Sequence, residues 1–88
     1  MAIIPAAAQA GVECAPRTAL LAGLATKFHE APIAVGLASS GALVEILTSA
    51  DGVTWTLLIS RPDGISCLVA SGQDWQKLAP VVPADVPL

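Results

Sequence analysis

The sequence predicts an α+β fold in which one N-terminal helix packs on a four-stranded antiparallel meander sheet, with a disulfide stapling helix to sheet. Three observations support this prediction. One segment has apolar residues at helical spacing. Four later segments alternate as strands do and are separated by short turn motifs. Two cysteines, Cys14 and Cys67, flank almost all of this region, and the 88-residue length allows one small domain.

The N-terminal segment, residues 1–10, is nearly all apolar and carries no charge. Its Ala8-Gln9-Ala10 has the small-x-small form that a signal peptidase accepts. We expect either the remnant of a secretory signal peptide or a disordered, alanine-rich N-terminus. The first interpretation predicts a periplasmic or secreted protein, with residues 11–78 forming the single α+β domain.

The helix is predicted over Arg17 to Glu30. Four apolar residues fall on one stripe of its surface: Leu20, Leu21, Leu24 and Phe28. Pro16 suits the first helical position, and Pro32 ends the helix because a proline restricts the residue before it.

Four extended segments follow: Ile33–Ala38, Ala42–Ser49, Thr54–Arg61 and Ile65–Ser71. The turn motifs between them are Ser39-Ser40-Gly41, Ala50-Asp51-Gly52 and Pro62-Asp63-Gly64. Asp-Gly supplies the positive-φ residues of tight hairpins, and such short connections predict neighbouring antiparallel strands. Residues 79–88 contain three prolines, which predict an extended tail.

Alternation along the strands assigns their residues to two faces. One face is apolar throughout, and we expect it to receive the helix; it carries Trp55, Leu57, Ile59, Ile65, Cys67 and Val69. The other face mixes Thr and Ser with four leucines. Those leucines and one tryptophan form our candidate interaction face: Leu43, Leu47, Leu58, Leu68 and Trp75. Alternatively the C-terminal segment covers the leucines, or they are merely dispersed.

The cysteine pair is predicted to form a disulfide that ties the helix to the sheet. The bond would close a loop of roughly 54 residues, which corresponds to about 4 kcal/mol in the chain-entropy model. A reactive thiol is the competing interpretation, since Cys14 stands close to a helix N-terminus. Two cysteines and His29 also amount to three zinc ligands, but their spacing is not that of a metal site, so we predict no metal.

No catalytic or cofactor-binding residues are predicted. Asp51 and Asp63 occupy turn positions that favour Asp for local hydrogen bonding, and His29 lies at the helix end without a partner. The net charge of −3, with four scattered basic residues, argues against nucleic-acid binding. No apolar run reaches the roughly 20 residues of a membrane-spanning helix.

Several short stretches resemble a group of small exported two-cysteine hypothetical proteins of alphaproteobacteria. They include Cys14-Ala15-Pro16-Arg17, Gly36-Leu37, Val44-Glu45-Ile46, Trp55-Thr56, Gly72 and the run from Pro62 to Val69. Phe28-His29-Glu30 departs from the Tyr-Gly-Glu type of ending that such proteins often carry. The resemblance implies an exported two-cysteine domain and no particular activity.

These features favour a non-enzymatic exported module that binds another protein or associates with itself. Two alternatives remain. One is a small inhibitor or accessory subunit of an exported enzyme that uses the Asp51-Gly52 and Asp63-Gly64 hairpin tips. The other is a thiol-dependent redox protein, which requires at least one free, acidic thiol.

Overall fold

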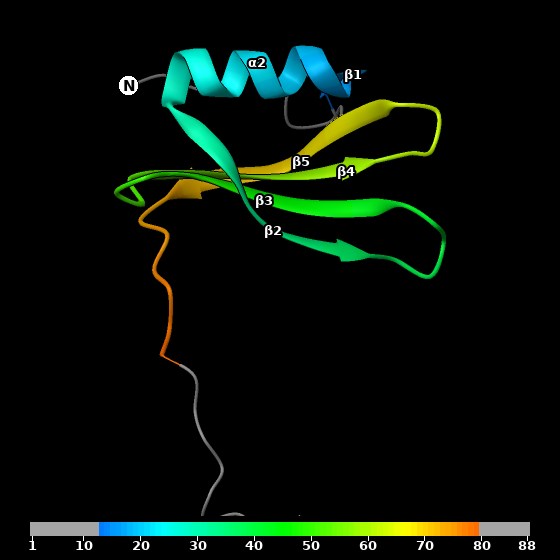
Figure 1. Ribbon diagram of the computed structural model, residues 1–88. Helices are drawn as coiled ribbons and strands as arrows, with labels where there is room; N and C mark the ends of the chain where they lie inside the picture. The colour runs from blue at the N-terminus through cyan, green and yellow to red at the C-terminus, as the bar shows by residue number, and fades with distance from the viewer. Residues whose placement is uncertain (1–12, 80–88) are drawn as a thin grey trace, which may run out of the picture.

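The computed structural model describes residues 13–79 and contains one helix and a five-stranded antiparallel sheet. Its elements are β1 (Glu13–Pro16), α2 (Arg17–Phe28), β2 (Glu30–Leu37), β3 (Leu43–Ser49), β4 (Thr54–Ser60) and β5 (Ile65–Gln73). The strand order is β1-β5-β4-β3-β2. In Figure 1, α2 lies on one side of the sheet and runs along the strands. The predicted signal remnant, residues 1–10, and the tail beyond Ala79 lie outside the described residues.

The α+β class is confirmed, but the predicted strand count is wrong. The missed strand is β1, which pairs with β5 so that Cys14 lies opposite Cys67. At four residues β1 is too short to show an alternating pattern, and it ends at a proline. Pro16 is therefore the residue before the helix, with φ −54° and ψ 139°, and not its first helical residue.

The helix ends two residues earlier than predicted. His29 adopts the left-handed conformation, with φ 57°, and its backbone N–H donates to the Ala25 carbonyl at 3.1 Å. This conformation stops the helix and turns the chain directly into β2, which begins at Glu30. The same reversal lets α2 and β2 lie next to each other at that end of the sheet (Figure 1).

The three predicted turns are confirmed. Each contains a glycine at positive φ: Gly41 at 91°, Gly52 at 76° and Gly64 at 90°. In the second turn the Asp51 carboxylate accepts hydrogen bonds from the Ser49 hydroxyl at 2.8 Å and the Val53 N–H at 3.2 Å. Both aspartates at the hairpin tips thus hold their own turns together, since Asp63 likewise accepts from the Ile65 N–H at 3.0 Å.

The core lies between α2 and the sheet face that carries Leu47 and Leu58. These two leucines are fully buried, and Leu24 of the helix is 7% exposed. Leu20, Leu21 and Leu68 pack around them. The helix therefore covers the mixed face, and the prediction that it covers the face of Trp55, Leu57 and Ile59 is wrong.

Small and paired polar side chains explain why the helix takes the mixed face. Ser60 and Ser66 are buried there and their hydroxyls hydrogen-bond to each other. Thr56 is also buried on this face, at 2% exposure. Short side chains leave room for a helix to approach, and buried hydroxyls cost little once they are hydrogen-bonded.

Candidate functional site

The predicted disulfide between Cys14 and Cys67 is confirmed. The two residues face each other across β1 and β5, with their Cα atoms 4.0 Å apart. The bond therefore joins two strands at the sheet edge, whereas the prediction had it joining the helix to the sheet. Both sulfurs are oxidised in this structure, so thiol chemistry at either cysteine would first require reduction.

The sheet face opposite α2 is the first candidate surface, and we call it the open face. It carries Val44, Ile46, Trp55, Leu57, Ile59 and Ile65, as the strand register and alternation show. In Figure 1 the elements of residues 13–79 leave this side uncovered, apart from the segment after β5 that departs at one end. No strand residue on the open face is charged. The described structure thus has an apolar face pointing away from its own core.

Two tryptophans occupy one end of the open face. The rings of Trp55 and Trp75 lie 5.7 Å apart between centroids, tilted by 52°. The backbone N–H of Trp75 donates to the Gly52 carbonyl at 2.9 Å, which anchors the segment after β5. Gly72 lies beside the Trp55 ring, where an added Cβ would come within 2.9 Å of it. Trp75 therefore belongs to the open face, not to the face of the four leucines.

The predicted interaction face is not exposed as a unit. Leu47 and Leu58 form the core beneath α2, and Leu68 packs against them. Leu43 is partly buried and lines a groove near the sheet edge. The prediction that these four leucines form a docking surface is wrong. Alternation sorted the residues between two faces correctly up to Leu68, but it missed the bulge that leaves Val69 without a partner in the β4–β5 register. It also contains no information on which face the helix covers.

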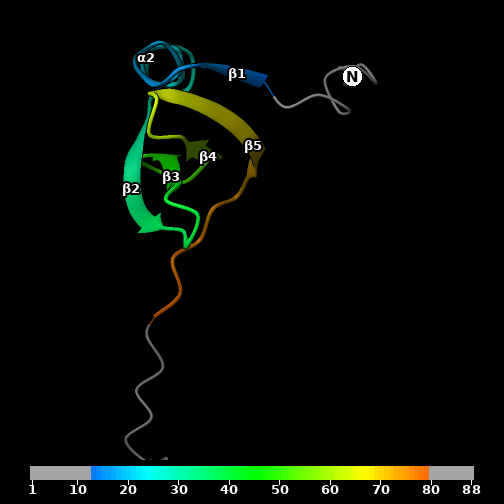
Figure 2. The ribbon, with the colours of Figure 1, turned by 90° about the vertical axis from the view of Figure 1, so that its right-hand side faces the viewer.

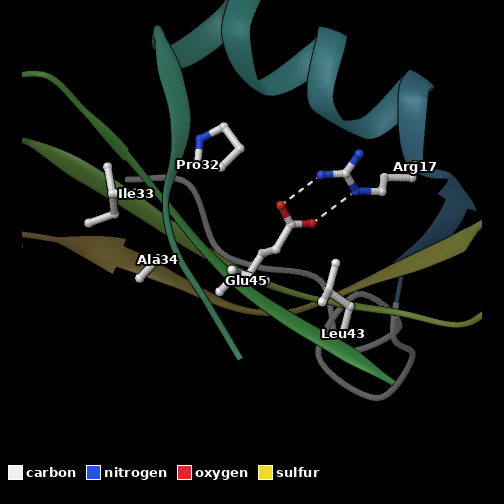
Figure 3. Close-up of a pocket in the computed structure, with 7 residues that line it drawn as sticks. Arg17, Pro32, Ile33, Ala34, Leu43 and Glu45 are labelled. Atoms are coloured by element: carbon white, nitrogen blue, oxygen red, sulfur yellow. Dashed lines mark hydrogen bonds and ion pairs between the residues drawn. The ribbon is translucent and has the colours of Figure 1, made fainter. Parts of the chain in front are cut away.

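The groove at Leu43 is the second candidate surface and has a volume of about 470 Å³. It is lined by Arg17, Pro32, Ile33, Ala34, Val35, Leu43 and Glu45. Figure 3 shows the residues of β2 along one side and the side chains of Arg17 and Glu45 pointing toward each other across the other. The groove combines an apolar wall from β2 with one neutralised ion pair.

That ion pair connects α2 to β3. The Arg17 guanidinium donates to both carboxylate oxygens of Glu45, at 2.9 and 2.7 Å. The Glu45 side chain is only 4% exposed, whereas that of Arg17 is 38% exposed. The hydrogen bond to Glu45 raises the pKa of Arg17 above its ordinary value. Sequence analysis missed this pair, although a glutamate within an apolar strand was a visible signal.

Glu30 is the other buried acid, at 3% exposure. Its Oε1 atom has no hydrogen-bond partner among residues 13–79. Within the same residues no group of three His, Cys, Asp or Glu side chains is placed to hold a metal ion. None of the helices described is long and apolar enough to cross a membrane.

Comparison with known proteins found no matching family model, no matching curated protein and no matching solved structure.

Proposed function

We propose that this protein is a non-enzymatic module that binds other proteins through the open face. The observation that carries the proposal is the inverted distribution of side chains on the sheet. The face under α2 contains buried Glu45, Thr56, Ser60 and Ser66 beside the core leucines, whereas the uncovered face has Thr48 as a polar residue among Val, Ile, Leu and Trp. An antiparallel sheet with one solvated face normally has polar residues on that face.

The dimensions of the open face support the same proposal. Strands of about seven residues at 3.4 Å per residue, spaced about 4.8 Å apart, give the sheet a footprint on the order of 400 Å² over four strands. The six apolar side chains named on the open face are each partly exposed within this footprint. Contiguous apolar patches of several hundred Å² mark interaction sites on soluble proteins. The two tryptophans at one end add the residue type most enriched at binding hot spots.

The proposed location is the periplasm or the extracellular space. A disulfide is compatible with an oxidising, exported compartment. For a domain this small the bond contributes a large share of the net stability, so an oxidising environment suits the protein.

The test uses a photo-activatable amino acid placed at Leu57 on the open face, with Ala22 on the exposed side of α2 as the matched control. Irradiation of the oxidised protein in periplasmic extract should give one discrete adduct from position 57 and none from position 22. The adduct should disappear when Ile46→Lys is added, because a buried unpaired charge opposes docking. Equal adducts from both positions, or none from position 57, would overturn the proposal.

The inhibitor alternative makes a different prediction in the same experiment. It places the contact at the Asp51 and Asp63 hairpin tips, so adducts would form there and not at Leu57. Both aspartates are engaged in their own turns, and this local role explains their presence without a partner.

A further inference from the structure

Strand β2 forms an exposed edge of the sheet. It stands last in the strand order, with β3 on one side only. The opposite edge is β1, which is four residues long, ends at a proline and is covalently tied to β5. β2 has eight residues, and every residue after Glu30 is exposed. Of the two edges, β2 is the one that offers a long strand for pairing (Figure 2).

The direction of the backbone hydrogen bonds along β2 shows which N–H and C=O groups are available to pair with another strand. The Ala38 N–H donates to the Ala42 carbonyl at 2.8 Å, which directs residue 38 toward β3. This direction alternates along an antiparallel strand. Gly36 therefore also directs its N–H and C=O groups toward β3, whereas Val35 and Leu37 direct theirs outward. No strand of the described sheet lies on that outer side.

The second half of β2 lacks the features that protect edge strands. Natural edges carry charges, prolines or bulges that oppose pairing with another chain. In β2, Pro32 and the bulge between Pro32 and Ala34 protect only the first half. From residue 31 to residue 42 the chain has no charged residue. Val35 and Leu37 are instead 63% and 76% exposed.

We propose that β2 pairs antiparallel with β2 of a second copy, about a two-fold axis at Gly36. In this register Val35 of each copy lies opposite Leu37 of the other. Each of these two pairs exchanges two hydrogen bonds, so the outward groups of all four residues are satisfied. Such an interface is isologous, because the same residues of both copies meet each other.

The register places glycine where the two strands approach most closely. Gly36 would face Gly36 of the second copy in a non-hydrogen-bonded pair, with Cα atoms about 4.5 Å apart. With no side chains there, the closest contact of the interface has no steric conflict. Leu37 of the second copy would lie beside Val35, at the groove that Val35 and Leu43 line.

The second copy is favoured over a charged peptide by the composition of the edge. Apolar Val35 and Leu37 match each other, and no charge on this segment repels its own copy. A two-fold axis perpendicular to the sheet also puts both open faces on the same side, which doubles the width of the apolar surface. The pairing depends on β2 alone, so a negative result for it would leave the proposed function of the open face unaffected.

The dimer is expected to be reversible. A ladder over four residues buries less than the roughly 1,200 Å² of stable complexes. A disulfide cross-link that captures the transient dimer, which we call the trap, is therefore the appropriate test. The protein already contains a disulfide between two paired strands. Cys14 and Cys67 form a disulfide across two antiparallel strands with Cα atoms 4.0 Å apart, close to the separation expected for Gly36 and its copy.

The trap is Gly36→Cys. A Cβ added at Gly36 meets nothing within 4 Å, so the substitution should leave the fold intact. Mild oxidation should give a covalent dimer about tenfold faster than in the controls, because pairing raises the local thiol concentration. One control is Gly23→Cys on α2, where an added Cβ also meets nothing within 4 Å. The other is Val35→Cys, which the register places opposite Leu37 and not opposite itself.

Peptide mapping without reduction must show a 36–36 link together with the intact bond between Cys14 and Cys67. Adding Val35→Lys to the trap should slow dimer formation about tenfold, since a lysine on an edge strand opposes pairing. Val53→Lys, at a turn position of similar exposure (55%), should not. The proposal is overturned if Gly36→Cys links no faster than Gly23→Cys, or if Val35→Lys has no greater effect than Val53→Lys.

Discussion

The Arg17 side chain closes over the Glu45 carboxylate, with Nε donating to Oε1 at 2.9 Å and Nη2 to Oε2 at 2.7 Å. This contact holds the first turn of α2 against the centre of β3. Because Glu45 is almost fully buried, the pair fixes which sheet face the helix covers. An unpaired carboxylate at this position would be costly, whereas a two-point hydrogen bond to a guanidinium compensates most of its lost hydration.

Removal of Arg17 should therefore destabilise the fold more than removal of an exposed arginine. We expect Arg17→Ala to lower the free energy of unfolding by about 1–3 kcal/mol, less than for a fully buried pair because solvent screens the half-exposed guanidinium. The matched control is Arg61→Ala, whose pair with Asp63 is more than half exposed on both sides. Urea titration of both variants should show the difference, and equal losses would contradict this account of Glu45.

Leu57 and Leu58, adjacent in β4, provide a test of which face is buried. Leu58 is fully buried under α2, so Leu58→Ala should cost about 3 kcal/mol. Leu57 lies on the open face and is only partly buried, so Leu57→Ala should cost about 1 kcal/mol. The reverse order, measured by thermal or urea unfolding, would mean that the helix covers the other face.

Reduction of the disulfide should remove a large part of the stability. The chain-entropy model gives about 4 kcal/mol for a loop of this length, which is comparable to the entire net stability of a small domain. We expect the Cys14→Ser/Cys67→Ser variant to be largely unfolded at 37 °C by circular dichroism. A double variant that keeps the wild-type midpoint would show that pairing of β1 with β5 does not need the bond.

The loss of folding stability at acid pH should depend in part on the two hairpin aspartates, Asp51 and Asp63. The Ser49 hydroxyl and then the Val53 N–H lower the pKa of Asp51, and the Ile65 N–H and then Arg61 lower that of Asp63. A carboxyl whose pKa is lowered by folding contributes stability above its unfolded pKa of about 3.9, and this contribution is lost as the pH falls below that value. Carboxyl NMR titration should find both groups below the ordinary value. Ser49→Ala should raise the pKa of Asp51 and leave that of Asp63 unchanged.

Local sequence features were sufficient for the secondary structure after Pro16. The helical stripe of leucines, the glycines at positive φ and the aspartates of the turns act within a few residues of the chain, so their pattern is visible without the fold. The disulfide partners followed from there being only two cysteines. Strand β1 was missed because its four residues are extended only through their pairing with β5, which lies about 50 residues further along the chain.

By itself, the sequence determined the α+β class, the order of the helix and the four later strands, and the division of strand residues between two faces. Only the tertiary structure decided which face the helix covers, because alternation is symmetric between the faces and the choice depends on long-range contacts. Arg17 with Glu45 and Ser60 with Ser66 satisfy the polar groups of the mixed face, so the helix can cover it. The Arg17–Glu45 contact joins residues 28 positions apart that no local pattern links, and the apolar face is left without a covering helix.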